Sequence, residues 1–94
     1  MRSEFEKRVF GIVKKIPKGG VLTYKEVARM AGRPRCCRQV GNILSRNQDA
    51  KMPCHRVIRT GGQIGGYNKG VSKKAALLKK EGVVLINRRV EKFE

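Results

Sequence analysis

The chain has 94 residues, which is enough for one small domain with a modest core and too few for two independently stable domains. Lysine and arginine number 23 against 7 acidic residues, so the formal net charge is +16. A charge this high causes self-repulsion and favours a polyanionic partner, with nucleic acid as the leading candidate. The sequence excludes a membrane-spanning helix, because it has no long apolar run. On charge alone, a ribosomal or packaging protein is a rival interpretation.

The first helix is predicted to begin at Ser3, whose spacing to Glu6 is that of a capping box, and to end before Pro17. The apolar residues between these points recur at helical intervals: Phe5, Val9, Ile12, Val13 and Ile16. The chain contains no internal repeat, linker or low-complexity stretch.

A second, short helix is predicted after Thr23, which has capping-box spacing to Glu26, and Gly32 is placed to end it. Pro34 then fits the first turn of a third helix. The inward stripe of that helix is predicted to hold Cys37, Val40, Ile43 and Leu44, and the residues facing elsewhere are Arg35, Arg38, Gln39, Asn42 and Arg46. A short helix, a glycine-containing turn and a helix with a basic face predict a helix-turn-helix.

The second half of the chain is less regular. Val57-Ile58 and Gln63-Ile64 are predicted to be the arms of a short β-hairpin around a Thr-Gly-Gly turn. The glycines of residues 65–70 allow a loop that approaches a ligand closely. A last helix is predicted from a cap at Ser72 to Gly82, and its apolar part is Ala75, Ala76, Leu77 and Leu78.

The predicted fold class is therefore α+β and mostly helical. We expect a single domain over residues 1–94, with a helix-turn-helix and a short hairpin near Cys54. No structural signal is present after Ile86.

The adjacent pair Cys54-His55 is the leading candidate for chemistry. His55 is the only histidine in the chain, and an imidazole and nearby positive charge are the usual means of raising the thiolate fraction of a cysteine. From Arg33 to Lys74 there are ten basic residues and one acidic residue, Asp49. The alternative, a small buried cysteine beside a satisfied histidine, is open on these two residues alone.

The other two cysteines indicate free thiols and not a disulfide framework. The total is odd, Cys36 and Cys37 are adjacent, and the sequence starts with no charged leader and apolar run, so a reducing cytoplasm is expected. Together with Cys54 and His55, these two cysteines supply as many ligands as a structural zinc site requires. Two adjacent pairs lack the intervening residues that turn paired ligands onto one metal. Zinc is thus the weaker interpretation, and we expect no metal or cofactor.

Five segments together resemble a known family. In chain order they are Arg38-Gln39-Val40-Gly41, Asn47, Pro53-Cys54-His55-Arg56-Val57, Gly65-Gly66-Tyr67 and Glu81-Gly82. Their order and spacing are similar to those of the C-terminal domain of O6-alkylguanine-DNA alkyltransferases. The resemblance covers nearly the whole chain, from the first helix to Gly82.

The resemblance implies a catalytic role for several residues. Cys54 would accept the alkyl group from guanine O6 irreversibly, and His55 would take the thiol proton through a water molecule. Glu81 would orient and stabilise the imidazole. Asn47 would brace the loop that carries the cysteine, although an ordinary Asx-type turn is an equal interpretation of that residue. Tyr24 would help to protonate the departing guanine.

The resemblance also implies how DNA is held. Arg38 would enter the base stack when the damaged nucleotide is turned out of the duplex, and Tyr24 would crowd its phosphate. The remaining DNA-binding residues would be Lys25, Arg35, Cys36, Cys37 and Thr60. The base pocket would be lined by Val57, through its backbone, and by Gly66, Tyr67 and Asn68. Exposed phosphate contacts or core packing are the alternatives for Arg38 and Tyr24.

The implied function is repair of O6-alkylguanine in double-stranded DNA, bound through the minor groove by a cytoplasmic monomer with no membrane contact and no cofactor. Familiar members of the family carry a further domain before this one, and Gly66 and Asn68 differ from the residues of some of them. The adduct range is therefore open. A second interpretation is a non-repairing lesion sensor, in which another residue commonly replaces the cysteine, and Cys54 argues against it.

Overall fold

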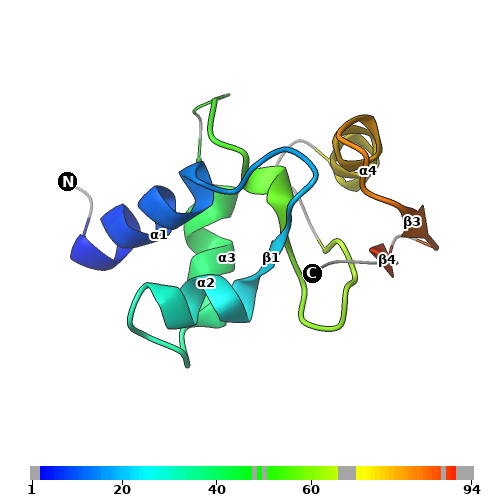
Figure 1. Ribbon diagram of the computed structural model, residues 1–94. Coiled ribbons are helices and arrows are strands. Elements are labelled where there is room, and N and C mark those ends of the chain that lie inside the picture. Colours follow the sequence, from blue (N-terminus) through cyan, green and yellow to red (C-terminus); the bar gives the residue numbers. More distant parts are fainter. Residues whose placement is uncertain (1–2, 48, 50, 66–69, 88, 91–94) are drawn as a thin grey trace.

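The computed structural model describes residues 3–47, 49, 51–65, 70–87 and 89–90. Figure 1 shows helices α1, α2 and α3 at one end, and α4 with strands β3 and β4 at the other; β1 and the green segment of residues 51–65 lie between them. The elements are α1 (Glu4–Lys14), β1 (Leu22–Thr23), α2 (Tyr24–Met30), α3 (Cys37–Ser45), the 3-10 turn η1 (Cys54–Arg56), β2 (Val57–Ile58), α4 (Val71–Lys80), β3 (Leu85–Ile86) and β4 (Arg89–Val90). This confirms the predicted class, which is mostly helical with short strands.

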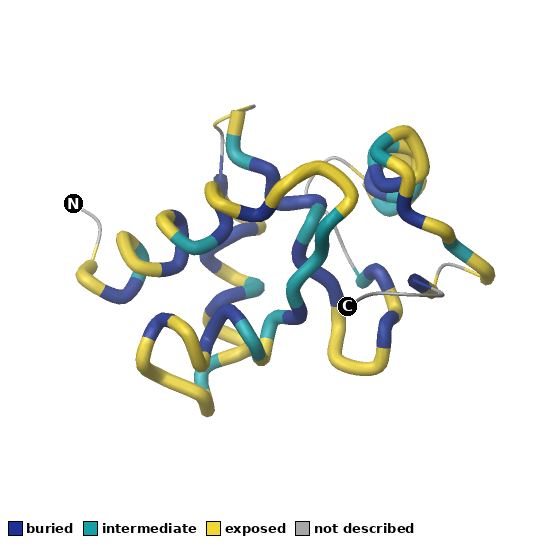
Figure 2. The backbone as a smooth tube through the Cα atoms, viewed as in Figure 1, coloured by how far each residue is buried: buried dark blue, intermediate teal, exposed yellow. Residues whose placement is uncertain are grey.

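Helix α1 begins where the sequence predicts it. The Ser3 hydroxyl oxygen accepts a hydrogen bond from the Glu6 backbone N–H at 3.2 Å, and this cap satisfies one of the free amides of the first turn. Phe5, Val9 and Val13 are buried in the core. In Figure 2 the buried stretches run through the interior shared by α1, α2 and α3, and the outer turns are exposed.

Helices α2 and α3 form the predicted helix-turn-helix. Thr23 and Glu26 make both bonds of the capping box, at 2.9 and 3.0 Å, and α2 ends just before Gly32, which has a φ of 89°. Two details of α3 differ from the prediction. Pro34 lies outside the helix, in a turn closed by a 2.9 Å hydrogen bond from the Cys36 N–H to the Arg33 carbonyl, where proline suits the second position. The inward stripe is Val40, Ile43 and Leu44, while Cys37 is exposed.

The predicted pairing of residues 57–58 with residues 63–64 is wrong. Strand β2 instead pairs in parallel with β1, with Val57 opposite Leu22. The chain does turn back, because the Arg59 N–H donates to the Gln63 carbonyl at 2.7 Å, but Gln63 forms an antiparallel bridge with Arg89. Both residues of β2 are fully buried, so core packing and not a local turn selects the partner strand. The pairing of β1 with β2 holds the start of α2 beside the reactive turn.

Helix α4 has a different cap from the one predicted. Gly70, with a φ of 100°, is the N-cap, and Ser72 lies inside the first turn. Leu78 is buried, but Ala75 and Leu77 are half-buried and Ala76 is exposed. The other buried residue of the helix is a lysine, Lys74. Together with Leu78, a second apolar cluster contains Ile58, Ile64, Val83 and Val90. Of the helices that the structure describes, none has the length and apolar character to span a membrane.

Candidate active site

Cys54 lies in the 3-10 turn η1, directly before β2. The turn is closed by a 3.0 Å hydrogen bond from the Arg56 N–H to the Pro53 carbonyl. Cys54 is 6% exposed and His55 is 8% exposed. Because β2 is paired with β1 and buried on the core, the backbone of the turn is fixed and the two side chains have defined positions.

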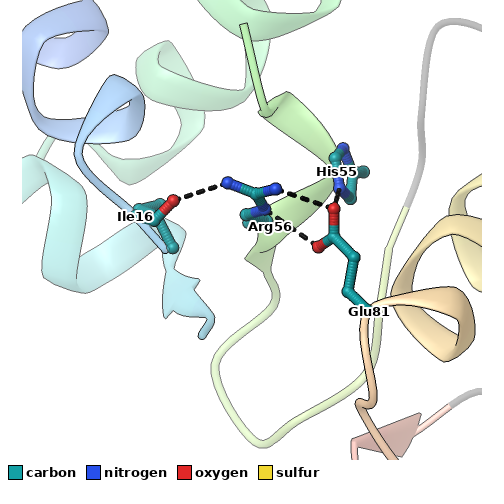
Figure 3. Close-up of polar contacts among 4 residues, drawn as sticks. All are labelled: Ile16, His55, Arg56 and Glu81. Carbon is teal, nitrogen blue, oxygen red and sulfur yellow. Dashed lines mark hydrogen bonds and ion pairs between the residues drawn. The ribbon is translucent and has the colours of Figure 1, made fainter. Parts of the chain in front are cut away.

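His55 is held by a carboxylate from the far end of the fold. Its Nε2 lies 3.0 Å from Oε2 of Glu81, which follows α4 (Figure 3). The pKa of Glu81 is lowered to about 2, first by hydrogen bonding from Arg56 and also by the hydrogen bond to His55. Glu81 is therefore ionised at neutral pH, and a charged carboxylate at Nε2 keeps a proton on that nitrogen. Nδ1 is then the nitrogen of His55 that can accept a proton.

Arg56 connects three parts of the chain, and no role was predicted for it from the sequence. Its Nε and NH2 groups donate to the two carboxylate oxygens of Glu81 at 2.9 and 2.7 Å. A third donor, NH1, reaches the Ile16 carbonyl just after α1 at 2.6 Å (Figure 3). The planar guanidinium group suits this paired recognition of a carboxylate. Arg56 therefore ties the reactive turn to the end of α4 and to the segment after α1.

A cavity of about 530 Å³ opens beside Cys54. Among the residues that the structure describes, its walls are formed by Tyr24, Cys37, Arg38, Gly41, Asn42, Leu44, Ser45, Cys54, Arg59 and Thr60. The site residues that the sequence predicts on this wall are thus Tyr24, Cys37, Arg38, Cys54 and Thr60. Arg59, Asn42 and Ser45 were not predicted. Gly66, Tyr67 and Asn68, which were predicted to line the base pocket, lie outside the described residues.

The buried lysine of α4 contacts two residues of the site, Val57 and Tyr24. Lys74 is 1% exposed, its Nζ donates to the Val57 carbonyl at 2.7 Å, and it lies 5.6 Å from the centre of the Tyr24 ring. Burial lowers the pKa of Lys74 to about 8, while the nearby Cys54 acts to raise it. The Val57 backbone, which was predicted to line the base pocket, thus accepts a hydrogen bond from a lysine that the sequence analysis did not include. In the sequence, the one signal for Lys74 was its position one helical turn before Leu78, which puts a charged residue on the apolar face of the helix.

Tyr24, the first residue of α2, has a half-buried side chain on the cavity wall. Burial raises the pKa of its phenol, and the positive charge of Arg59 partly offsets this. The hydroxyl group of Tyr24 therefore carries its proton at neutral pH. It is a hydrogen-bond donor within the same cavity as the thiol.

Asn47 is buried in the loop between α3 and the reactive turn. Its Nδ2 donates to the Asp49 carbonyl at 2.9 Å, and its Oδ1 accepts from the Asp49 N–H at 3.3 Å. These bonds are those of an Asx-type turn. These bonds are compatible with both interpretations of Asn47, because an Asx-type turn also fixes the loop in which it lies.

The predicted DNA-binding residues are on or near the surface. Lys25, Arg35, Arg38, Cys37 and Thr60 are exposed, and Cys36 is half-buried against the core. Over the described part of the chain, no group of three or more histidine, cysteine, aspartate or glutamate residues is placed to hold a metal ion.

These features define a class of protein: a helix-turn-helix domain in which a cysteine on a cavity wall is followed by a histidine that a carboxylate orients. The family model described as "6-O-methylguanine DNA methyltransferase, DNA binding domain" matches residues 4–83, and the chain belongs to this family.

Its relatives include enzymes named methylated-DNA–protein-cysteine methyltransferase. That of Methanothermobacter thermautotrophicus is 48% identical over 85 residues, which are 88% of this chain and 47% of the relative. That of Saccharolobus islandicus is 50% identical over 80 residues, covering 84% of this chain and 51% of the relative. The chain thus spans about half the length of these curated relatives.

Two solved structures are also similar. S. pombe Atl1, in complex with damaged DNA containing O6-carboxymethylguanine, is 37% identical with a TM-score of 0.82, covering 92% of this chain and 83% of Atl1. Mycobacterium tuberculosis OGT in complex with DNA is 36% identical with a TM-score of 0.80, covering 86% of this chain and 50% of OGT.

Proposed function

We propose that this protein repairs O6-alkylguanine in duplex DNA by transferring the alkyl group to Cys54. The observation that carries the proposal is the position of Cys54, on the wall of a cavity and next to an imidazole bonded to an ionised carboxylate. The names of the curated relatives, and the DNA in the solved complexes, support it. A cytoplasmic protein with access to chromosomal DNA is part of the proposal.

The first chemical step is removal of the thiol proton. His55 accepts it at Nδ1 through a water molecule, and the charge of Glu81 at Nε2 stabilises the imidazolium that results. Lys74, close to the thiol and positively charged, stabilises the thiolate by Coulomb attraction. No cofactor takes part in this step.

The second step is displacement at the alkyl carbon. The thiolate sulfur forms a bond to that carbon, the bond from carbon to O6 breaks, and its electron pair remains on guanine. Guanine then takes a proton, and we assign its donation to the protonated phenol of Tyr24 on the cavity wall. The products are a thioether on Cys54 and an unmodified guanine.

The reacting base must leave the stack, because O6 inside a duplex cannot reach a thiol that is 6% exposed. Arg38 lies on helix α3 and on the cavity wall, and we assign to it the filling of the gap that the base leaves. We assign Lys25, Arg35 and the exposed start of α3 to the phosphate backbone, with approach from the minor groove by a monomer.

A lesion sensor that binds the base without repairing it is the second candidate. The similarity to Atl1 over 83% of that chain favours it. The cysteine at position 54 favours transfer, because sensors of this kind commonly carry another residue there.

Transfer is tested with duplex DNA whose O6-methyl group is isotopically labelled. The label should move to protein and map to the peptide that contains Cys54, and the Cys54→Ser variant should bind the same DNA without acquiring label. If the wild-type protein binds the lesion selectively but no labelled peptide is found, the lesion-sensor function replaces the transferase function.

A further inference from the structure

One side of the cavity is formed by an arginine that neither the fold nor the proposed chemistry requires. Arg59 follows β2, is exposed, and lines the same cavity as Cys54. Its side chain lies over Gly65: a Cβ added to that glycine would be 3.1 Å from Cγ and 3.5 Å from Nε of Arg59. Gly65 therefore leaves the space that the side chain of Arg59 occupies.

The guanidinium group is close to the reactive centre. Its positive charge lowers the pKa values of both Tyr24 and Lys74, and Cys54 acts on the same two groups in the opposite direction. Arg59 and Lys74 thus place two basic side chains around one thiol. Arg59 and Cys54 line the same cavity, so their charges interact through it by Coulomb forces.

The positive charge is not cancelled within the cavity. None of the described residues that line it is an aspartate or a glutamate. The nearest carboxylate in the mechanism, Glu81, is already bonded to Arg56 and His55. An anion that enters the cavity therefore meets Arg59 without competition from a lining carboxylate.

We propose that Arg59 makes this cavity selective for O6 adducts that carry a negatively charged group, of which O6-carboxymethylguanine is the simplest. The inference rests on the proposed function, because it needs the adduct to enter the Cys54 cavity. A carboxylate matches the planar fork of an arginine and can accept two hydrogen bonds from it. It also repels the thiolate, so a cation between them helps this adduct more than a neutral methyl group.

The transfer step balances without an oxidant or reductant. The Cys54 sulfur attacks the methylene carbon, the bond from that carbon to O6 breaks, and guanine keeps the electron pair and takes up the proton that the thiol has lost. The protein product is an S-carboxymethyl thioether.

The test compares two duplexes that differ only in the adduct, O6-methylguanine or O6-carboxymethylguanine. The measured quantity is the ratio of the two single-turnover rates, so that a general loss of DNA affinity cancels. Arg59→Gln should lower the carboxymethyl-to-methyl ratio about tenfold, the low end for losing a hydrogen bond to a charged group. Arg59→Lys keeps the positive charge but not the planar guanidinium group, so its ratio should lie between those of the wild-type and Arg59→Gln proteins. Arg8→Gln removes the same charge from α1, away from the cavity wall, and should leave the ratio unchanged.

An unchanged ratio in Arg59→Gln, with both rates reduced equally, would overturn the inference and assign Arg59 to the phosphate backbone. If the wild-type protein takes up neither alkyl group, the proposed transfer fails instead. In that case the inference is decided by binding. The affinities of the Cys54→Ser protein and of the Cys54→Ser, Arg59→Gln double variant are measured for each of the two duplexes. A carboxymethyl preference that disappears with Arg59 supports it, and equal affinities contradict it.

Discussion

Replacing Glu81 with glutamine removes the charge that Arg56 and His55 share. In the folded protein the pKa of Glu81 is about 2, against an ordinary value of 4.5, and a difference of this size corresponds to roughly 3 kcal/mol of stability. The side chain of Glu81 is 11% exposed, and screening by the adjacent solvent removes part of this energy. We expect Glu81→Gln to lower the free energy of unfolding at pH 7 by about 2 to 3 kcal/mol, because the Arg56 guanidinium loses its counter-charge.

The pH dependence gives the sharper test. A carboxyl group with a lowered folded pKa stabilises the protein fully above its unfolded pKa, and the contribution is lost as pH falls through the folded value. The window therefore runs from about 4.5 down to about 2, and about 2 kcal/mol should be lost by pH 3.

Urea unfolding of the wild-type and Glu81→Gln proteins between pH 7 and pH 3 measures this difference. It should be constant above pH 5 and shrink below it. Glu4→Gln removes a carboxylate whose side chain is 71% exposed, and it should have almost no effect at any pH. A Glu81→Gln difference that stays constant down to pH 3 would refute the assignment of an ionised, tightly bonded Glu81.

Three further predictions concern single side chains. His55→Ala should slow alkylation of Cys54 at neutral pH by about 100-fold and shift the rate profile to higher pH; an unchanged profile in rapid-quench assays would assign thiol activation to the positive field alone. Arg38→Ala should impair reaction with duplex DNA more than reaction with a free O6-alkylguanine base, because only the duplex requires extrusion, and equal losses would remove Arg38 from that role. Burial lowers the pKa of Lys74 from 10.5 to about 8, so the unfolded chain binds the proton more tightly. The stability of the wild-type protein relative to Lys74→Met should therefore rise between these pH values, by up to about 3 kcal/mol, and a flat difference in urea unfolding would contradict the buried position of the amine.

Local signals in the sequence predicted the helices well. The Thr23 capping box is made by residues three positions apart, so the sequence alone contains the whole interaction. Ser3 is similar. The first-turn position predicted for Pro34 and the cap predicted at Ser72 are wrong by a few residues, because a turn closed at Arg33 and a glycine at position 70 determine where α3 and α4 begin.

Contacts between distant residues were beyond sequence reasoning. The partner of β2 is 35 positions earlier in the chain, and nothing in Val57-Ile58 specifies it. Arg56 was visible in the reactive motif, but its bonds to Glu81 and to the Ile16 carbonyl follow from the tertiary fold. The link between His55 and Glu81 came from the family resemblance, and the structure places the two side chains in contact. The roles assigned to the site residues remain predictions until they are tested in solution.

The central claim, that Cys54 is consumed by alkyl transfer, is tested most directly by counting product against protein. A thioether has no good leaving group, so each protein molecule should repair one lesion and never be regenerated. Intact-mass spectrometry after mixing with excess O6-methylguanine duplex should show one added methyl group per molecule, and the guanine restored should equal the protein modified. An unchanged mass with selective binding of the lesion, or more than one guanine restored per protein molecule, would contradict the claim.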